Sequence, residues 1–354
     1  DTKAIYSDGA GSGGKMVDAF ASLSVVDLKV QDDLTVTDDV AIGGILGVTG
    51  AVNFAADVTF ADGADIITAS AGTSNFRAGV NAGNSIASGG NYNVTVGDEA
   101  GTAITTGEGN VAIGFEALST EDANGHNTAI GYQSLKTLNA GANSRNVAVG
   151  YQAGLDMTTG IRNVLMGTFA GANLIAGSNN TAFGEQALTT DRNGHHSTAF
   201  GHAALANQDF ATATDSNNTA VGYNAGISVT TGHENNLFGA FTGDALTTGI
   251  ENALFGYLSG TSLTDANYNC VLGTQALATD TKGSRSIAIG QGALNAQNFT
   301  TSTDTHNVAV GNHAGLSVTT GVQNTLIGSK AGDALTDADF NTAVGMLALS
   351  GDTL

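Results

Sequence analysis

A nine-residue unit that recurs along most of the chain constrains the fold more than any other feature. One copy runs from Asn218 to Gly226, and the fifth residue is a glycine in all 16 copies. These marker glycines are Gly79, Gly97, Gly114, Gly131, Gly150, Gly167, Gly184, Gly201, Gly222, Gly239, Gly256, Gly273, Gly290, Gly311, Gly328 and Gly345. Most follow the previous one by seventeen positions, with longer steps of nineteen or twenty-one ending at Gly150, Gly222 and Gly311. A short fixed period is typical of a solenoid, whose coils pack only against their neighbours.

An asparagine stands four residues before the marker glycine, at position −4, in 14 copies, and Ser197 and Ser286 are the exceptions. A side-chain amide both donates and accepts hydrogen bonds, and stacked coils would bring successive amides within about 4.8 Å. We therefore predict a structural ladder along the stack. From the third copy onward its members are Asn110, Asn127, Asn146, Asn163, Asn180, Asn218, Asn235, Asn252, Asn269, Asn307, Asn324 and Asn341.

The residues just before the glycine are apolar on both faces of the strand that they would form. Position −1 is apolar throughout, and position −2 is Ala or Leu in 13 copies, among them Ala148, Ala220 and Leu254. Side chains alternate along a strand, so positions −1 and −3 share one face and position −2 lies on the other. A strand that is apolar on both faces is buried on both. We expect the first face to fill the coil, position −2 to face a second chain in an oligomer, and the glycine to bend the backbone between two short strands.

The longer steps recur at the same place in three blocks that begin near Gly114, Gly184 and Gly273. The inserted residues, such as 208–216 and 297–304, should bulge from one side of the stack. Insertions in solenoids often form the binding face, but tolerated surface loops left by duplication are slightly favoured here. Both interpretations are consistent with the sequence.

Composition excludes several classes of function. The chain has 50 Gly, no Pro, no Trp, 12% charged residues and a net charge of −21. A phosphate backbone would repel that charge, which argues against a nucleic-acid partner. No apolar run is as long as a membrane-spanning helix requires. The single cysteine, Cys270, cannot form an intrachain disulfide, and we expect it to be a small core residue.

The N-terminal part is organised differently. Residues 1–27 contain a Gly-Ser stretch and suit an attachment segment, and residues 28–63 repeat pairs of apolar residues every six positions. Such a strip is too small to fold alone, so three chains wound into a β-prism shaft are favoured over a monomeric hexapeptide β-helix. Residues 64–78 would form a neck, and residues 79–354 the head of stacked repeats.

The repeats, written N-[TV]-A-[IVF]-G-x-x-A-[GL], resemble the parallel β-roll heads of trimeric autotransporter adhesins. They resemble still more the related repeats of phage and prophage tail-fibre proteins. The resemblance covers roughly residues 75–349, although adhesin heads typically have shorter coils. It implies a β-roll of three identical chains that attaches to a host or other surface. The expected fold class is all-β: a parallel β-roll or β-helix solenoid head of about 16 coils on a trimeric β-prism shaft.

Candidate sites are few. Tyr132, Tyr151, Tyr223 and Tyr257 each follow a marker glycine, and such a row could bind a ligand, stack on sugar rings, or simply pack laterally between strands. His126, His196 and His306 each precede position −4, where an axial trimer could gather an ion, but solvated turns are favoured for them. Carboxylates such as Asp191, Asp215, Asp280 and Asp304 are expected in turns. We predict no catalytic residues, no metal and no cofactor.

These observations favour a non-enzymatic homotrimeric fibre or adhesin on a virion surface, in particular a phage tail or capsid fibre. Its N-terminal segment would attach to a virion or cell-surface protein, and its head would engage a host-surface glycan or protein. One alternative is a bacterial cell-surface adhesin or filament subunit, which would be extracellular. A second alternative is a polysaccharide-degrading tailspike, although a thin solenoid without Trp offers little burial for a glycosidase cleft.

Overall fold

The computed structural model describes residues 6–7, 16–17, 70–141 and 143–351, and the chain divides into two compact units, Asp1–Ala64 and Asp65–Leu354. In the first unit, β1 (Tyr6–Ser7) pairs antiparallel with β2 (Met16–Val17). The expected shaft, residues 28–63, lies outside the described residues.

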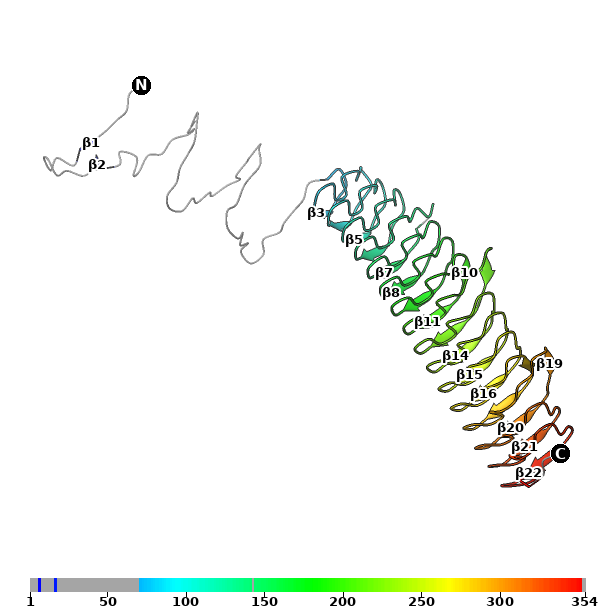
Figure 1. Ribbon diagram of the computed structural model, residues 1–354. Coiled ribbons are helices and arrows are strands. Elements are labelled where there is room, and N and C mark those ends of the chain that lie inside the picture. The colour runs from blue at the N-terminus through cyan, green and yellow to red at the C-terminus, as the bar shows by residue number, and fades with distance from the viewer. Residues whose placement is uncertain (1–5, 8–15, 18–69, 142, 352–354) are drawn as a thin grey trace. The chain divides into compact units, whose positions relative to one another are not determined.

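The second unit is a parallel β-solenoid of 16 coils (Figure 1). Each coil contributes one three-residue strand to a single 16-stranded sheet, and neighbouring strands pair in register. The strands are β3 (Phe76–Ala78), β4 (Val94–Val96), β5 (Val111–Ile113), β6 (Thr128–Ile130), β7 (Val147–Val149), β8 (Val164–Met166), β9 (Thr181–Phe183), β11 (Thr198–Phe200), β13 (Thr219–Val221), β14 (Asn236–Phe238), β15 (Ala253–Phe255), β16 (Cys270–Leu272), β18 (Ile287–Ile289), β20 (Val308–Val310), β21 (Thr325–Ile327) and β22 (Thr342–Val344). The described residues contain no helix, so the all-β solenoid is confirmed. Its first strand, β3, lies within the residues assigned above to the neck.

The orientation expected for the strands is wrong. Position −2 points into the coil, where Ala112, Ala220 and Leu254 are fully buried. Positions −1 and −3 point outward, and Phe200 at position −1 is 49% exposed. The interior beside each strand is narrow and admits Ala or Leu, whereas the bulky residues of position −1 lie outside.

The core is filled by two kinds of coil, which differ four residues after the glycine, at position +4. In one kind position +4 is a buried leucine, such as Leu118. In the other it is a glycine, and a Cβ on Gly154 would lie 2.8 Å from Leu135 Cδ2 and 2.9 Å from Leu165 Cδ1. The side chains of Leu135 and Leu165 therefore leave room only for glycine at position 154, as close packing demands.

The marker glycines end each strand, whereas the sequence had suggested that they join two strands. Their φ angles are positive, for example +137° at Gly256. They also stack on one another, since a Cβ on Gly256 would lie 2.6 Å from the carbonyl oxygen of Gly273. Both the backbone conformation and the close approach of the next coil require glycine here.

The two longest steps each add a short parallel ribbon outside the main sheet. β10 (Gly194–His195) pairs with β12 (Thr214–Asp215), and β17 (Gly283–Ser284) pairs with β19 (Thr303–Asp304). The inserted residues therefore lie beside the stack as expected, and they are anchored to it by backbone hydrogen bonds.

Candidate functional site

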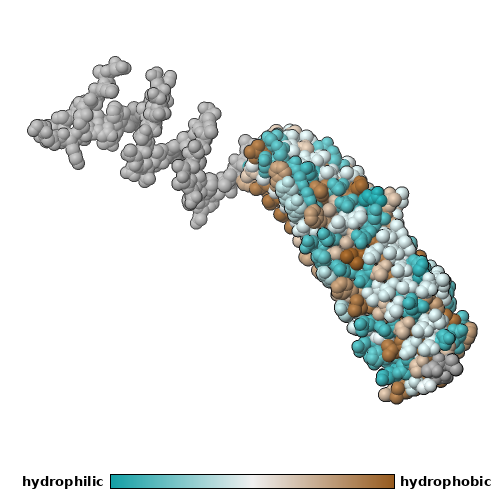
Figure 2. Space-filling model, viewed as in Figure 1, coloured by the Kyte–Doolittle hydropathy of each residue, from teal (hydrophilic) through white to brown (hydrophobic). Residues whose placement is uncertain are grey.

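The outward face of the 16-stranded sheet carries apolar side chains along its whole length. Leu272 at position −1 is 52% exposed, and Phe183, Ile287 and Ile327 are also exposed. Adjacent rings stack along the face, with centroids 4.8 Å apart for Phe183 and Phe200 and 4.9 Å apart for Phe238 and Phe255. In the view of Figure 2, apolar residues recur along the solenoid among polar ones. Soluble monomers rarely expose an apolar face that is continuous over such a length.

Cys270 lies on this outward face and is exposed. The expectation that it would be a core residue is therefore wrong. It occupies position −3, between Ala253 and Ile287 of the neighbouring strands. Because it is the only cysteine of the chain, its thiol is a unique chemical probe of this face.

The four predicted tyrosines lie in an exposed column one residue after the marker glycines. Tyr132 and Tyr151 stack with centroids 5.3 Å apart, and Phe115 stacks on Tyr132 at 5.2 Å. Tyr223 stacks on His202 at 5.1 Å, whereas Tyr257 contacts Phe241 only edge-on, at 6.3 Å. The structure thus groups the first two tyrosines and separates them from the other two.

This stacking limits what the tyrosine column can bind. Both faces of the Tyr132 ring are covered by neighbouring rings, so a sugar ring could not stack on it. The exposed parts of the stacked rings are their edges and hydroxyl groups. Of the four tyrosines, Tyr257 alone has no stacked ring partner among the described residues.

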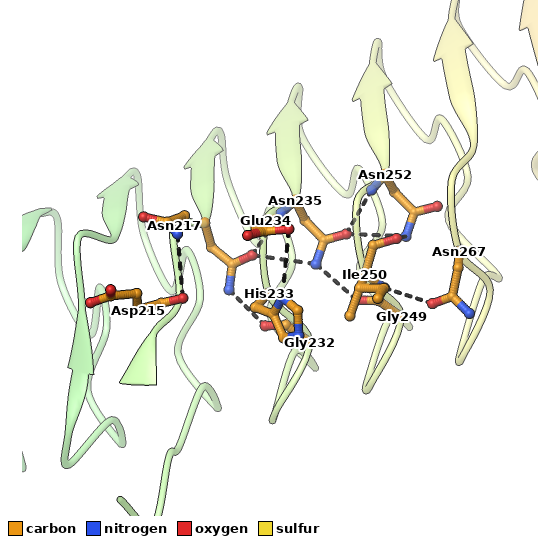
Figure 3. A network of polar contacts seen from close by, with 11 residues as sticks. Asp215, Asn217, Gly232, His233, Glu234, Asn235, Gly249, Ile250, Asn252 and Asn267 are labelled. Atoms are coloured by element: carbon orange, nitrogen blue, oxygen red, sulfur yellow. Dashed lines mark hydrogen bonds and ion pairs between the residues drawn. The ribbon is translucent and has the colours of Figure 1, made fainter. Parts of the chain in front are cut away.

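The asparagines of position −4 form a hydrogen-bonded ladder inside the solenoid (Figure 3). The side-chain oxygen of Asn235 accepts the backbone N–H of Asn252 at 3.0 Å, and its Nδ2 donates to the carbonyl of Gly249 at 2.9 Å. The same pair of bonds recurs along the stack, for example at Asn93 and Asn146. Most of these amides therefore satisfy one donor and one acceptor of the next coil away from water, whereas Asn127 Nδ2 donates to Asn110 Oδ1 of the previous coil at 3.3 Å and to the carbonyl of Gly125 at 3.4 Å. Asn110 through Asn324 are buried, and Asn341 in the last coil is half-buried.

The ladder is interrupted at Ser197, where the inserted segment supplies a replacement amide. The buried Gln208 donates through Nε2 to Ser197 Oγ at 2.9 Å and to Asp191 Oδ2 at 2.6 Å. Its oxygen accepts from Asn218 Nδ2 at 2.8 Å, which restores the connection to the next ladder asparagine. Asp191 Oδ1 also accepts the backbone N–H of Gly194 at 3.0 Å. Burial raises the pKa of Asp191, and its hydrogen bonds oppose that rise.

An equivalent buried cluster lies one block further along the chain, at the second interruption. Gln297 donates to Ser286 Oγ at 2.9 Å and to Asp280 Oδ2 at 2.6 Å, and it accepts from Asn307 at 2.8 Å. In the first block the ladder keeps Asn127, and a buried leucine, Leu138, stands where the others have Gln. These clusters anchor the insertions to the core.

Asp191 and Asp280 lie between strands, as expected, but both are fully buried. Sequence reasoning missed these clusters although a signal exists. Leucine stands at position +4 in six coils before the last one, and these coils form three pairs. Three residues after that leucine, the first coil of each pair has Glu121, Asp191 or Asp280, and the second has Leu138, Gln208 or Gln297. In the coils with glycine there, that residue is apolar.

Apart from the buried Glu121, Asp191 and Asp280, the ionisable residues of the described ranges are partly or fully exposed. His196 Nδ1 lies 3.2 Å from Asp215 Oδ1, and Arg285 Nε lies 3.1 Å from Asp304 Oδ1, so each contact joins the two sides of one inserted ribbon. Within the described ranges, no three His, Cys, Asp or Glu residues gather as a metal site. Over the same residues, no helix has the length and apolar character to cross a membrane.

Comparison of the chain with protein-family models, with curated proteins and with solved structures gives no match. The surfaces described above are therefore the basis for assigning a function.

Proposed function

We propose that the chain is a subunit of a non-enzymatic homotrimeric fibre that attaches a virion, in particular a phage, to a host surface. The observation that carries this proposal is the apolar outward face of the sheet. It runs along the whole stack of coils, and burying it between identical chains removes its contact with water. This face replaces position −2 as the proposed interface, because position −2 fills the coil interior.

Three copies are favoured by two further features of the sequence. The apolar pairs of residues 28–63 suit a three-chain shaft, and the head repeats resemble those of trimeric adhesins and tail fibres. The solenoid would then be the outer, receptor-binding part, joined through residues 1–27 to a virion or other surface protein. A cell-surface adhesin would use the same architecture, and the neighbouring genes distinguish the two, since phage baseplate genes would favour the fibre.

The oligomeric state tests the proposal directly. Sedimentation equilibrium of the full chain should give three times the monomer mass of 35.2 kDa, or about 106 kDa. Replacing Phe200 by Glu places a charge at three equivalent points of the face and should prevent assembly. A folded monomer at micromolar concentration would refute the trimer.

The non-enzymatic part of the proposal has its own test. The trimer should release no new reducing ends from capsule or lipopolysaccharide of the host. Release of such ends would instead identify a polysaccharide-degrading tailspike.

A further inference from the structure

We propose that a groove on the side of the solenoid binds a neutral sugar unit, which would make it the glycan subsite of the fibre. The groove is a hollow of about 350 Å³, lined by Asp156, Asn173, Ile175, Thr190, Arg192 and Asp209. This inference rests on the proposed attachment function and names the chemistry of the ligand. The volume lies within the range of small-molecule sites, at its lower end.

The groove is built by two rows of side chains on successive coils. Asp156, Asn173 and Thr190 each stand six positions after a marker glycine, one on each of three consecutive coils. The second row consists of Ile175, Arg192 and Asp209, which each stand eight positions after a marker glycine. Stacking sets members of a row about 4.8 Å apart.

Part of the backbone of the groove is occupied by bonds between coils. The N–H of Asp156 donates to the carbonyl of Ala172 at 2.8 Å, and the N–H of Ile175 donates to that of Arg192 at 2.9 Å. The heads of Asp156 and Asn173 are exposed and make no hydrogen bond or ion pair within the described part of the chain.

These two free heads suit the hydroxyl groups of a sugar. A carboxylate accepts from hydroxyls, and a side-chain amide both donates and accepts. Ile175, which is 39% exposed, adds an apolar contact for the C–H face of a pyranose ring. A small number of polar groups around an apolar contact is the usual composition of a ligand site.

The charges of the groove select against anionic sugars. Arg192 donates to both oxygens of Asp209, through Nε at 2.7 Å and Nη2 at 2.9 Å, so this pair is internally neutralised. The carboxylate of Asp156 then remains as the uncompensated charge of the lining, on a chain with net charge −21. A uronate or sialate would be repelled, whereas a neutral hexose or N-acetylhexosamine would not.

The repeat itself provides a matched control. One block further along the chain, the repeat pattern recurs, but Ala245 and Ser262 replace Asp156 and Asn173. At the same place Thr281 and Asn298 replace the Arg192–Asp209 ion pair. The combination of groups is therefore specific to one place on the solenoid and is not a general consequence of the repeat.

Saturation-transfer NMR with the full chain tests the subsite. The probes are the methyl glycosides of glucose, galactose, mannose and N-acetylglucosamine, with methyl glucuronide as the anionic comparison. We expect binding of at least one neutral glycoside with a Kd on the order of 1 mM, and at least ten-fold weaker binding of the glucuronide. The double variant D156A/N173A should weaken neutral binding at least ten-fold, and D156N should weaken it less. The control T281A/N298A should leave it unchanged.

Three outcomes would overturn the subsite: no neutral glycoside binds the folded chain, the glucuronide binds equally well, or D156A/N173A binds like the parent. Sedimentation of the same samples separates this inference from the fibre proposal. A trimer that binds no glycoside refutes the groove and leaves the fibre, and a monomer that binds through Asp156 and Asn173 refutes the fibre.

Discussion

At the scale of single residues, the ladder asparagine is used because its side chain imitates a peptide group. Asn218 donates to Gln208 Oε1 and to the carbonyl of Gly232, both at 2.8 Å, and accepts the N–H of Asn235 at 2.9 Å. Serine cannot replace these contacts alone, which explains why Ser197 occurs together with Gln208. A hydroxyl group is too short to span two coils.

Three substitutions near this point should therefore have very different effects on the melting temperature. Asn218→Ala leaves the three buried partners of the amide without a hydrogen bond, and should lower the free energy of unfolding by roughly 1 to 3 kcal/mol per chain or somewhat more. Ala220→Asp buries an unpaired charge inside the coil and should cost several kcal/mol or prevent folding. Asp215→Ala removes one exposed contact with His196 and should lie within about 0.5 kcal/mol of the parent. Thermal unfolding followed by circular dichroism would measure this order, and a parent-like Ala220→Asp variant would contradict the inward orientation of position −2.

Glu121 gives a pH dependence of defined sign. Burial raises its pKa, and its Oε2 has no hydrogen-bond partner within the described residues. Because the folded pKa lies above the unfolded one, the folded chain holds this proton more tightly. Stability is then full below the ordinary carboxyl pKa of about 4.3 and is lost as pH rises through the raised pKa, by about 1.4 kcal/mol for each pH unit that separates the two. Glu121→Gln should therefore gain stability relative to the parent as pH rises above the ordinary carboxyl pKa of about 4.3.

Glu116 is the matched control for that experiment. A hydrogen bond from Lys136 lowers its pKa, so its contribution is present above the unfolded pKa and is lost as pH falls. Glu116→Gln should consequently lose stability relative to the parent as pH rises, by a small amount because the pair is solvent-screened. If the stability of both variants relative to the parent changed with pH in the same direction, burial of Glu121 would not be the cause of its pH dependence.

Prediction from the sequence succeeded for the ladder amides, whose hydrogen-bonding groups define their contacts, and failed for residues that are merely apolar. The asparagine ladder was predictable because an amide that recurs once in nearly every repeat can bond to its own copies along a stack. The inward orientation of position −2 was not predictable. The two faces of a strand are told apart by alternation of apolar and polar residues, and here both faces are apolar. Size was the informative property: Ala220 fits the narrow interior, and Phe200 does not.

At the scale of the coil, the two kinds of unit explain how insertions are tolerated. Coils with leucine at position +4 carry the buried polar clusters, and each pair of them precedes one of the long steps. The cluster residues of the insertion, such as Gln208, bond inward while the rest of the segment forms the outer ribbon. This coupling of distant positions needs three-dimensional contacts, so spacing alone did not reveal it.

A double-mutant cycle should expose that coupling. Ser197→Asn introduces a larger amide beside Gln208, and Gln208→Leu removes the donor to Asp191, so each change should cost about 1 to 3 kcal/mol. Together they reproduce the arrangement of Asn127 and Leu138 in the first block. We expect a favourable coupling of about 0.5 to 3 kcal/mol in denaturant unfolding. If the two changes in unfolding free energy were strictly additive, Gln208 would not be replacing the amide that Ser197 lacks.

The glycine column provides a second test at this scale. Gly256→Ala combines an unfavourable φ of +137° with a Cβ only 2.6 Å from the next coil, and should cost more than about 3 kcal/mol. Gly345 has a similar φ of +124° but no atom within 4 Å of the added Cβ. Gly345→Ala should therefore show the conformational cost alone, about 1 to 3 kcal/mol. Equal losses in melting temperature for the two variants would show that the close approach of the next coil contributes nothing to the requirement for glycine.

At the scale of the whole molecule, the inside and outside of the solenoid have opposite consequences. The interior is closed within one chain, since the ladder and the two kinds of coil fill the core without a partner and leave few buried polar atoms, such as Glu121 Oε2, unpaired. The outward sheet face is not satisfied in this way, and its exposed Phe, Ile and Leu residues give the reason to expect assembly. The number of chains in that assembly follows from neither the period nor the packing of one solenoid.

Cys270 allows the location of that assembly to be tested without disturbing it. If three chains bury the outward face, the thiol should react with a maleimide at least ten-fold more slowly in the native protein than after denaturation. The control is C270S/D215C, whose thiol would replace an aspartate with 68% of its side chain exposed on the inserted ribbon. That thiol should react at nearly the same rate in both states. If Cys270 is labelled fast in a particle of trimer mass, the protein is a trimer whose interface lies on another face of the solenoid.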